Sequence, residues 1–262
     1  MDLGLGGKRA IITGGSRGIG KQCALALARE GVRVCIAART QETLNQALVE
    51  INQTGHKGHA VAADLTTQAN CERVVQAAID RFGGVDILVN NVGAARNADI
   101  LELSPELIDD ALTLKAYSYL RMSQLVIPYM KGNQWGRIIN IAGSAGTSPT
   151  RGNIPTGAAN ITILNITRAL SDAVAADGIL VNTVCPGLTN TGRARTQQSA
   201  RAEREGRDVE ELLQALGHEL PAGRIAEPAE VANVVAFLAS EACSYMFGTA
   251  LYMDGGKRRA TP

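Results

Sequence analysis

A glycine-rich turn near the N-terminus is the first part of the chain that predicts a chemical function. Gly14, Gly18 and Gly20 follow the apolar run 9–13 and precede an amphipathic stretch. In such a turn the first glycine permits tight turning, the second lets the backbone approach a pyrophosphate, and the third lets the helix pack on the strand. The helix N-terminus then faces the phosphates. The turn therefore predicts a dinucleotide site, to which we also assign Ser16, Arg17 and Ile19.

The end of the second apolar run predicts which dinucleotide binds. An acidic residue about 20 positions after the turn would bind the ribose 2′-hydroxyl of NAD. This chain has Arg39 there instead, and Arg17 lies within the turn. Two guanidinium groups beside one ribose suit a 2′-phosphate, because they form charge-assisted, bidentate hydrogen bonds. We therefore expect NADP(H) in preference to NAD(H); the alternative is a pair of solvated surface arginines.

Short β-branched runs alternate with longer helical patterns along the chain. Strands this apolar are buried on both faces, which requires helices on both sides of a parallel sheet. We therefore predict a single α/β domain over residues 1–262, with a Rossmann-type, doubly wound parallel sheet of seven strands. The expected strands are 9–13, 32–37, 59–63, 85–90, 137–141, 179–185 and 250–253, and the expected helices include 18–29, 41–52, 68–82, 105–130, 157–176 and 230–240.

A polar segment at about residues 189–223 departs from this pattern. Five arginines and two glutamates fall between residues 193 and 207. A solvated helix and a mobile substrate lid both account for such a charge run. Its position after the sixth strand, at the carboxyl edge where α/β sheets bind ligands, is what favours the lid.

The overall composition excludes several classes of partner. A net charge of +1 gives no electrostatic footprint for nucleic acid or an anionic membrane. The sequence has no apolar run long enough for a membrane span and no pattern of a secretory signal at its start. The five cysteines form no CxxC pair, and the three histidines lack metal-ligand spacing. We expect a cytoplasmic protein with a small-molecule substrate and no metal.

Motifs spread over essentially the whole length resemble those of the short-chain dehydrogenase/reductase family, and are most similar to its 3-oxoacyl-carrier-protein reductase-like branch. In chain order they are Thr13-Gly14-x3-Gly18-x-Gly20, Asp64-Leu65, Asn90-Asn91-Val92-Gly93, Gly136 to Ile141, Val181-Asn182-x3-Pro186-Gly187 and Asp254-Gly255-Gly256. The resemblance implies that Asp64 and Leu65 border the adenine and that Asn90, in the motif with Gly93, lies near the adenosine ribose. It further places Pro186, Gly187 and Thr189 beside the nicotinamide.

The resemblance also implies a catalytic set: a proton-donating tyrosine, a lysine four residues later, a serine about 13 residues before the tyrosine, and an asparagine on the preceding long helix. In this chain the tyrosine and lysine positions fall on Thr156 and Asn160. The serine position falls on Gly143, with Ser144 one residue out of register, and the asparagine position falls on Lys115. We take as candidate catalytic residues Lys115, Ser144, Thr156 and Asn160.

Three functions stay open on these residues. Our working prediction is an NADP(H)-dependent oxidoreductase of a carbonyl or alcohol substrate with an atypical centre. Lys115 would then act as acid or electrostatic clamp beside Thr156 or Ser144, because desolvation lowers a lysine pKa; otherwise it is a solvated lysine on a polar helix face. The second is a catalytically silent NADP(H)-binding subunit or sensor, and the third is a non-redox enzyme on the same fold.

The surroundings of the site are also expectations at this point. We expect the cleft to be lined by residues around Ala94, by 143–151 and by the 190–220 segment. The resemblance implies a homo-oligomer, a tetramer or dimer; a silent subunit would instead pair with an active relative. The substrate itself is not specified by the sequence.

Overall fold

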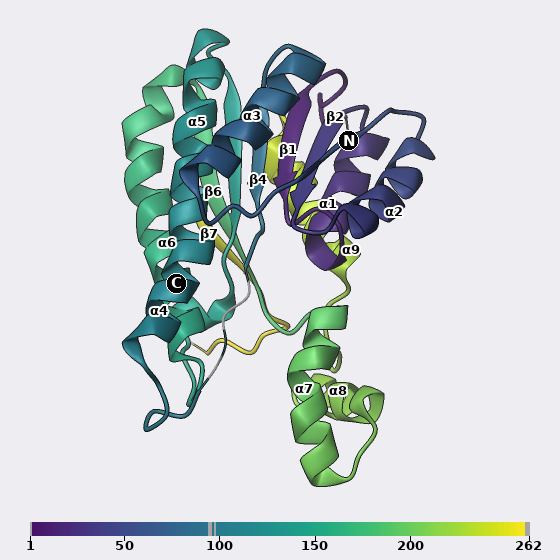
Figure 1. Ribbon diagram of the computed structural model, residues 1–262, viewed down its shortest axis with the longest axis vertical. Coiled ribbons are helices and arrows are strands. Elements are labelled where there is room, and N and C mark those ends of the chain that lie inside the picture. Colours follow the sequence, from purple (N-terminus) through teal and green to yellow (C-terminus); the bar gives the residue numbers. More distant parts are fainter. Residues whose placement is uncertain (1, 94–95, 97, 260–262) are drawn as a thin grey trace.

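The chain forms one parallel sheet of seven strands, and the prediction of a doubly wound α/β fold is confirmed. The computed structural model describes residues 2–93, 96 and 98–259. The strand order is β3-β2-β1-β4-β5-β6-β7 (Figure 1). The strands are β1 Arg9–Thr13, β2 Arg33–Ala38, β3 His59–Ala62, β4 Ile87–Asn90, β5 Gly136–Ile141, β6 Ile179–Pro186 and β7 Ala250–Met253.

Helices cover both faces of the sheet. Helices α1, α2 and α9 pack on one face, and α3, α5 and α6 pack on the other. The helices are α1 Gly18–Arg29, α2 Gln41–Asn52, α3 Gln68–Phe82, α4 Pro105–Ala111, α5 Ser118–Gly132, α6 Ile154–Val174, α7 Gly192–Glu205, α8 Val209–His218 and α9 Pro228–Ala239. None among the described residues is long and apolar enough to cross a membrane.

The strands are apolar at consecutive positions because each face of the sheet has its own core. Ile11 and Ile12, neighbours on β1, are both fully buried but belong to different clusters, one under α3 and α5 and the other under α1 and α9. Successive side chains of a strand point to opposite faces, so a strand covered on both sides needs no polar alternation. All five cysteines are buried free thiols within this interior.

The expected long helix 105–130 is present as a continuous helical run over residues 105–132, but it contains a π-helical turn that the sequence did not predict. A π-helical segment, Leu112–Tyr117, separates α4 from α5. The Ser118 hydroxyl donates to the Leu114 carbonyl across 2.7 Å, a back-bond that competes with the regular helical pattern. Such π-segments are frequent at functional sites, because the extra residue changes the direction of the side chains in the turn. Here the altered turn contains Lys115.

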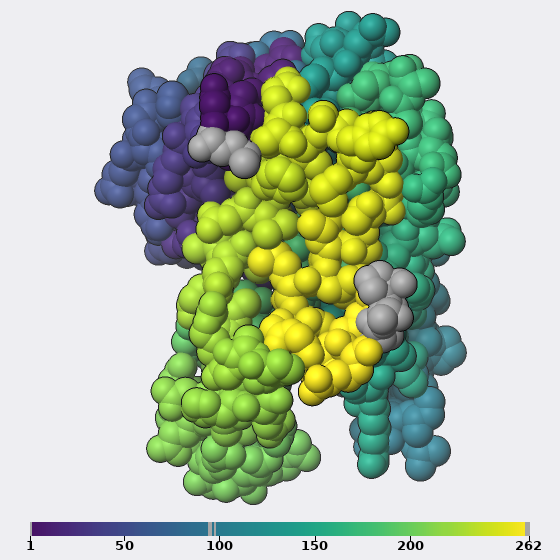
Figure 2. Space-filling view, turned by 180° about the vertical axis from the view of Figure 1, so that it is seen from behind, coloured from purple at the N-terminus to yellow at the C-terminus, as the bar shows by residue number. Residues whose placement is uncertain are grey.

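The polar segment after β6 forms a two-helix lobe. Helices α7 and α8 project beyond the carboxyl end of the sheet (Figure 1). Seen from behind, the lobe stands beside the last described residues of the chain, drawn in yellow (Figure 2). An ion pair between Arg195 and Glu210 joins the two helices. Much of the charge run therefore lies on an exposed, ion-paired helix surface, and a lid role for the segment stays a prediction.

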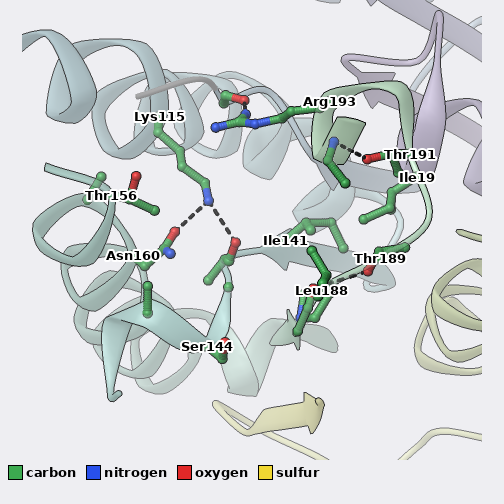
Figure 3. A pocket seen from close by; sticks show the side chains of 18 of the residues that line it. Ile19, Lys115, Ile141, Ser144, Thr156, Asn160, Leu188, Thr189, Thr191 and Arg193 are labelled. Atoms are coloured by element: carbon green, nitrogen blue, oxygen red, sulfur yellow. Dashed lines mark hydrogen bonds between the residues drawn. The ribbon is translucent and has the colours of Figure 1, made fainter. Parts of the chain in front are cut away.

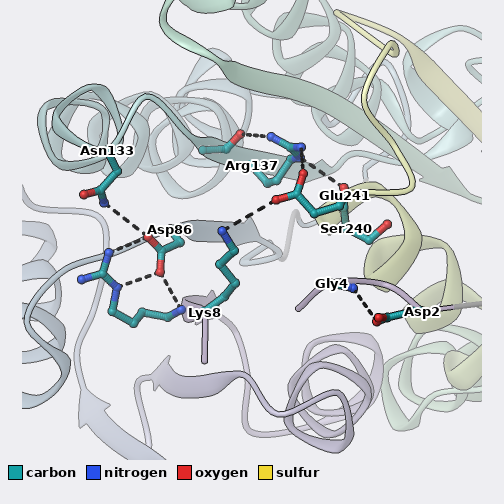
Figure 4. Close-up of polar contacts among 10 residues, drawn as sticks. Asp2, Gly4, Lys8, Asp86, Asn133, Arg137, Ser240 and Glu241 are labelled. Carbon is teal, nitrogen blue, oxygen red and sulfur yellow. Dashed lines mark hydrogen bonds and ion pairs between the residues drawn. The ribbon is translucent and has the colours of Figure 1, made fainter. Parts of the chain in front are cut away.

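A cluster of charged residues binds the elements together at the amino ends of the strands, opposite the glycine turn. The Arg9 guanidinium forms two hydrogen bonds to Asp86, at 2.7 and 2.5 Å (Figure 4). The residue Arg137 is 3% exposed, and its guanidinium lies over the Trp135 ring at 4.3 Å. Glu241, two residues after the end of α9, lies 3.8 Å from both Lys8 and Arg137. This edge is consistent with a structural role.

Candidate active site

Two adjoining cavities lie at the carboxyl ends of the strands. The larger, about 740 Å³, runs from the glycine turn past the ends of β2 and β3. The smaller, about 260 Å³, lies between α6, the loop after β6 and the start of α7. Lys115 and Arg193 line both, so they stand where the two cavities meet. Open α/β sheets bind ligands at this edge.

The glycine turn shapes the inner wall of the larger cavity. Gly14 has a φ of +64°, which a residue with a side chain rarely adopts. A Cβ on Gly20 would lie 2.3 Å from the Gly14 carbonyl oxygen and 2.4 Å from the Asn91 amide nitrogen. Helix α1 begins after Arg17 with no side-chain cap on its first turn. Its amide hydrogens are thus available for an anion at the helix N-terminus.

Positive charge gathers at the outer end of the larger cavity. Arg17 and Arg39 both line it and are exposed. Within the described part of the chain neither guanidinium forms an ion pair or hydrogen bond. The carboxylate nearby is Asp64, whose Oδ1 accepts a hydrogen bond from the Thr66 amide across 3.1 Å. Two unpaired guanidiniums and one acid leave a net positive site for a phosphate.

Most residues predicted to hold the cofactor line these cavities. Around the larger one are Gly14, Ser16, Arg17, Gly18, Ile19, Arg39, Asp64, Leu65 and Gly93. Around the smaller one are Pro186, Gly187 and Thr189, and Ile19 and Gly93 line both. Gly20 lies behind the turn, where its missing side chain permits the packing described above.

The placement of Asn90 needs a correction. Its side chain is fully buried and donates to Asn140 Oδ1 across 2.9 Å, inside the protein and away from both cavities. The residue that lines the larger cavity is its neighbour Asn91. The Asn91 side-chain amide donates to the carbonyls of Thr13 and Gly14 at 3.2 and 3.3 Å, and so fixes the glycine turn against β4.

Lys115 is held in place where the two cavities meet. Its Nζ donates to the Ala142 carbonyl across 2.7 Å and to Asn160 Oδ1 across 2.5 Å (Figure 3). An ammonium has three N–H groups and a neutral amine has two. With both anchors kept, the ammonium therefore has one N–H left, and the neutral amine has a lone pair left. The structure thus contradicts the alternative of a solvated surface lysine.

The chain makes room for this arrangement at Gly143. Asn160 is 1% exposed, and a Cβ on Gly143 would lie 2.8 Å from its side-chain nitrogen. A serine at residue 143 would therefore crowd the amide that anchors Lys115. The glycine, the asparagine and the lysine fit one another as a set.

The surroundings of Lys115 favour the neutral amine. Burial lowers the pKa of Lys115 to about 7, and the positive charge of Arg193 contributes to the shift in the same direction. A site of low dielectric constant removes the hydration of the ammonium, and this loss costs the charged form more free energy than the neutral amine. A group with this pKa can both give and accept a proton near neutral pH.

The other two candidate residues share the smaller cavity. Ser144 begins a short 3₁₀ helix, Ser144–Gly146, and Thr156 lies on α6 one turn before Asn160. The fold thus brings together all four predicted catalytic residues, which come from three separate elements. No tyrosine lines either cavity among the described residues.

The expected cleft lining is confirmed only in part. Residues 143–145 line the smaller cavity, whereas the Arg151 side chain is 89% exposed and pairs with Asp99. Ala94 lies outside the described residues. No group of three potential metal ligands occurs in the described ranges of the chain.

Arg193 is a residue of the site that the sequence argument missed. It lies in the first turn of α7, just after the cap residue Thr191, whose hydroxyl accepts from the Ala194 amide across 3.1 Å. The Arg193 guanidinium donates to the Gly93 carbonyl on the opposite side of the cavity mouth. Its place directly after β6, at the carboxyl edge of the sheet, was the available signal, but the surrounding charge run obscured it.

These features describe an α/β protein with a glycine-rich phosphate turn and two adjoining cavities at the carboxyl ends of its strands. A family described as enoyl-(acyl carrier protein) reductase matches residues 14–258. The 3-oxoacyl-(acyl-carrier-protein) reductase of Vibrio cholerae is 35% identical over 97% of this chain and 98% of its own length. The chain belongs to the short-chain dehydrogenase/reductase family of oxidoreductases.

Solved structures agree with this assignment. The L-sorbose reductase of Gluconobacter frateurii, solved with NADPH and L-sorbose, superposes with a TM-score of 0.96 at 32% identity, with 100% of both chains covered. A xylitol dehydrogenase solved with NAD+ gives a TM-score of 0.90 at 26% identity, with 96% of this chain and 99% of that chain covered. Related folds thus bind either nicotinamide cofactor.

Proposed function

We propose that this protein is an NADP(H)-dependent oxidoreductase that interconverts a carbonyl and an alcohol in the smaller cavity, with Lys115 transferring the proton. The observation that supports this most directly is the position of the Lys115 amine, at the junction of the two cavities. When bound, the nicotinamide cofactor supplies or takes up the hydride. The chain's own residues must then bind the substrate and move a proton at its oxygen.

Lys115 meets the requirements of that proton transfer. In the reduction its third N–H would donate to the carbonyl oxygen; in the oxidation its lone pair would accept the hydroxyl proton. The two anchors, at Ala142 and Asn160, keep the nitrogen in place in both protonation states. The hydroxyls of Ser144 and Thr156 line the same cavity and would orient the substrate oxygen.

The preference for NADP(H) rests on Arg17 and Arg39. Both line the outer end of the larger cavity and are without ionic partners within the described ranges. A 2′-phosphate placed between them would receive charge-assisted hydrogen bonds, whereas the 2′-hydroxyl of NAD would leave two like charges uncompensated. The uncapped α1 N-terminus, with Gly14 and Gly18 in the cavity wall beside it, fits the pyrophosphate.

Two measurements test the proposal. Calorimetric titration should show NADPH binding more tightly than NADH. NADPH oxidation with a panel of aldehydes and ketones should then be detectable in the wild type and lost in Lys115→Met, which should still bind NADPH. Absence of binding by either nucleotide would overturn the cofactor assignment and favour a non-redox role.

A silent NADP(H)-binding subunit is the second candidate function, because no tyrosine lines the cavities in the described part of the chain. In that case NADPH would bind, but the wild type and Lys115→Met would show the same negligible turnover. A change in the rate of a co-purified reductase would support it.

Assembly with another chain is a further part of the proposal. Exposed apolar side chains occur on the outer side of α5, α6 and the π-segment, namely Tyr117, Tyr129 and Ile161, each 40 to 45% exposed. A second copy or an active relative would cover them. Light scattering coupled to gel filtration distinguishes a dimer or tetramer from a monomer.

A further inference from the structure

The charge of the smaller cavity is unusual for a site that would bind a neutral sugar or ketone. Its described lining contains two ionisable side chains, Lys115 and Arg193, and no aspartate or glutamate. The rest consists of small or apolar residues and a few hydroxyls and amides. Two cations therefore face one cavity without a carboxylate to balance them.

Arg193 and Arg204 are the two arginines of α7 that lack a carboxylate partner among the described residues, and of these two Arg193 lines the cavity. Arg201 and Arg207 lie 2.7 and 3.7 Å from Glu205, and Arg195 pairs with Glu210. Arg193 has no carboxylate partner among the described residues, and its hydrogen bond goes to the neutral Gly93 carbonyl. Arg193 is exposed at the rim of the cavity, and partial desolvation there lowers the pKa of its guanidinium.

The geometry gives the two cations different tasks. The Lys115 nitrogen is held deep in the cavity by Ala142 and Asn160. The Arg193 side chain extends from α7 toward Lys115 (Figure 3). A guanidinium has five N–H groups in a planar fork that matches a carboxylate, and a single bond to Gly93 leaves most of them available.

We propose that the substrate is a small oxo acid or hydroxy acid whose carboxylate binds Arg193 while its carbonyl or hydroxyl oxygen faces Lys115. The cavity of about 260 Å³ would also receive the nicotinamide beside Pro186, Gly187 and Thr189, so the space left for the substrate suits a short molecule. The inference rests on the proposed function, because it reserves Lys115 for the reacting oxygen. A carboxylate also neutralises the unpaired charge of Arg193, which a neutral ketone does not.

Arg193 also lines the larger cavity, so a rival role is contact with a phosphate of the cofactor. The two roles differ in which affinity depends on Arg193. A substrate role affects binding of an acid but not of its methyl ester. A cofactor role affects binding of the nucleotide and leaves the ratio of acid to ester unchanged.

The test is calorimetric titration in the presence of saturating NADP+, a state in which a carbonyl compound binds but cannot be reduced. The probes are pyruvate, acetoacetate and levulinate, in which zero, one and two methylene groups separate carbonyl and carboxylate, each compared with its methyl ester. In the wild type the best acid should bind at least about tenfold more tightly than its ester.

Variants of Arg193 test whether the difference in affinity between acid and ester depends on its side chain. Arg193→Gln should abolish the advantage of the acid and leave the ester unaffected, and Arg193→Lys should keep part of it. Arg204→Gln is the matched control, because Arg204 lies on the same helix, is exposed, and bonds only to the Ala200 carbonyl among the described residues. It should change nothing.

Each other outcome has a separate meaning. Equal binding of acid and ester by the wild type overturns the inference, and so does a loss of NADP+ affinity in Arg193→Gln with an unchanged acid-to-ester ratio. Arg193-dependent binding of an acid, with no oxidation of NADPH by any of the three acids, supports the inference and counts against the proposed redox function.

Discussion

The Nζ of Lys115 and the Oδ1 of Asn160 are joined by a 2.5 Å hydrogen bond that links the π-helical segment to α6. Because an amide carries no net charge, this bond fixes the position of the amine without compensating for the burial of an ammonium. A carboxylate in the same place would stabilise the charged form and raise the pKa. The pairing with asparagine thus keeps a lysine both immobile and able to lose its proton near neutral pH.

The first prediction concerns the pH dependence of catalysis. The pKa of Lys115 is lowered to about 7, and reduction requires the protonated form. We expect kcat/KM for carbonyl reduction to fall as pH rises through about 7, and kcat/KM for alcohol oxidation to rise over the same range, since this parameter reports the free enzyme. Steady-state rates from pH 5.5 to 9 in both directions would measure it, about 1.5 to 2 units to either side of that pKa.

Lys115→Met should remove this inflection and lower the rate by about 10² to 10⁴. Lys131→Met is the control, because Lys131 is exposed near the end of α5 and pairs with Asp177 away from the cavities. A profile that keeps its inflection without Lys115 would show that another group transfers the proton.

The second prediction uses Asn160→Asp to change the charge without removing the hydrogen bond. A carboxylate at this distance from Nζ should raise the pKa of Lys115. The reduction should therefore remain fast to higher pH, and the oxidation should need a higher pH than in the wild type. The shift of the inflection, not the absolute rate, is the measurement that identifies the contact.

Asn153→Asp provides the matched comparison for that variant. Asn153 precedes α6 and its side-chain oxygen accepts from the Thr150 amide, a bond that aspartate preserves. It adds the same charge to the start of the same helix without touching Lys115. If both variants move the inflection equally, a long-range field and not the Asn160 contact controls the pKa.

The third prediction concerns cofactor choice. Arg39→Asp replaces a guanidinium at the end of β2 with a carboxylate suited to the ribose hydroxyls of NAD. We expect NADPH affinity to fall by roughly 10- to 100-fold and NADH affinity to rise, because a phosphate would meet a like charge. Lys57→Asp, an equal change of charge in an exposed loop, should leave the ratio unaffected. An unchanged ratio in Arg39→Asp would exclude Arg39 from the ribose site.

The sequence predicts the sheet and the phosphate turn well because both depend on local patterns. Helix α3 occupies residues 68–82 as expected, and β1 occupies residues 9–13. The glycine spacing after β1 likewise predicts a tight turn, and the structure shows its close packing at Gly20. In these cases periodicity and turn chemistry along a few residues decide the outcome.

The details of the site depend on contacts between distant residues, which such patterns do not contain. The bond from Lys115 to Asn160 joins residues 45 positions apart, and the space for it comes from Gly143. Two adjacent asparagines leave open which one faces the cavity; the structure buries Asn90 against Asn140. The π-segment that directs Lys115 has no recognised sequence signature, and the back-bond of Ser118 is visible only in the structure.

The last prediction separates stability from function at the opposite edge of the sheet. Asp86 accepts hydrogen bonds from the Arg9 backbone amide and from two nitrogens of its guanidinium, at 2.5 to 2.9 Å. Its side chain is 9% exposed, so Asp86→Ala leaves a poorly hydrated cation and an unpaired amide. We expect a loss of about 3 kcal/mol in the free energy of unfolding, measured by urea denaturation. Glu50→Ala, which breaks the more exposed pair with Lys21, should cost no more than about 1 kcal/mol.

Since this edge lies at the amino ends of the strands, away from both cavities, folded Asp86→Ala should bind NADPH with wild-type affinity. A weakened affinity in the folded variant would mean that the two edges of the sheet are coupled and that the charged cluster also supports the cofactor site.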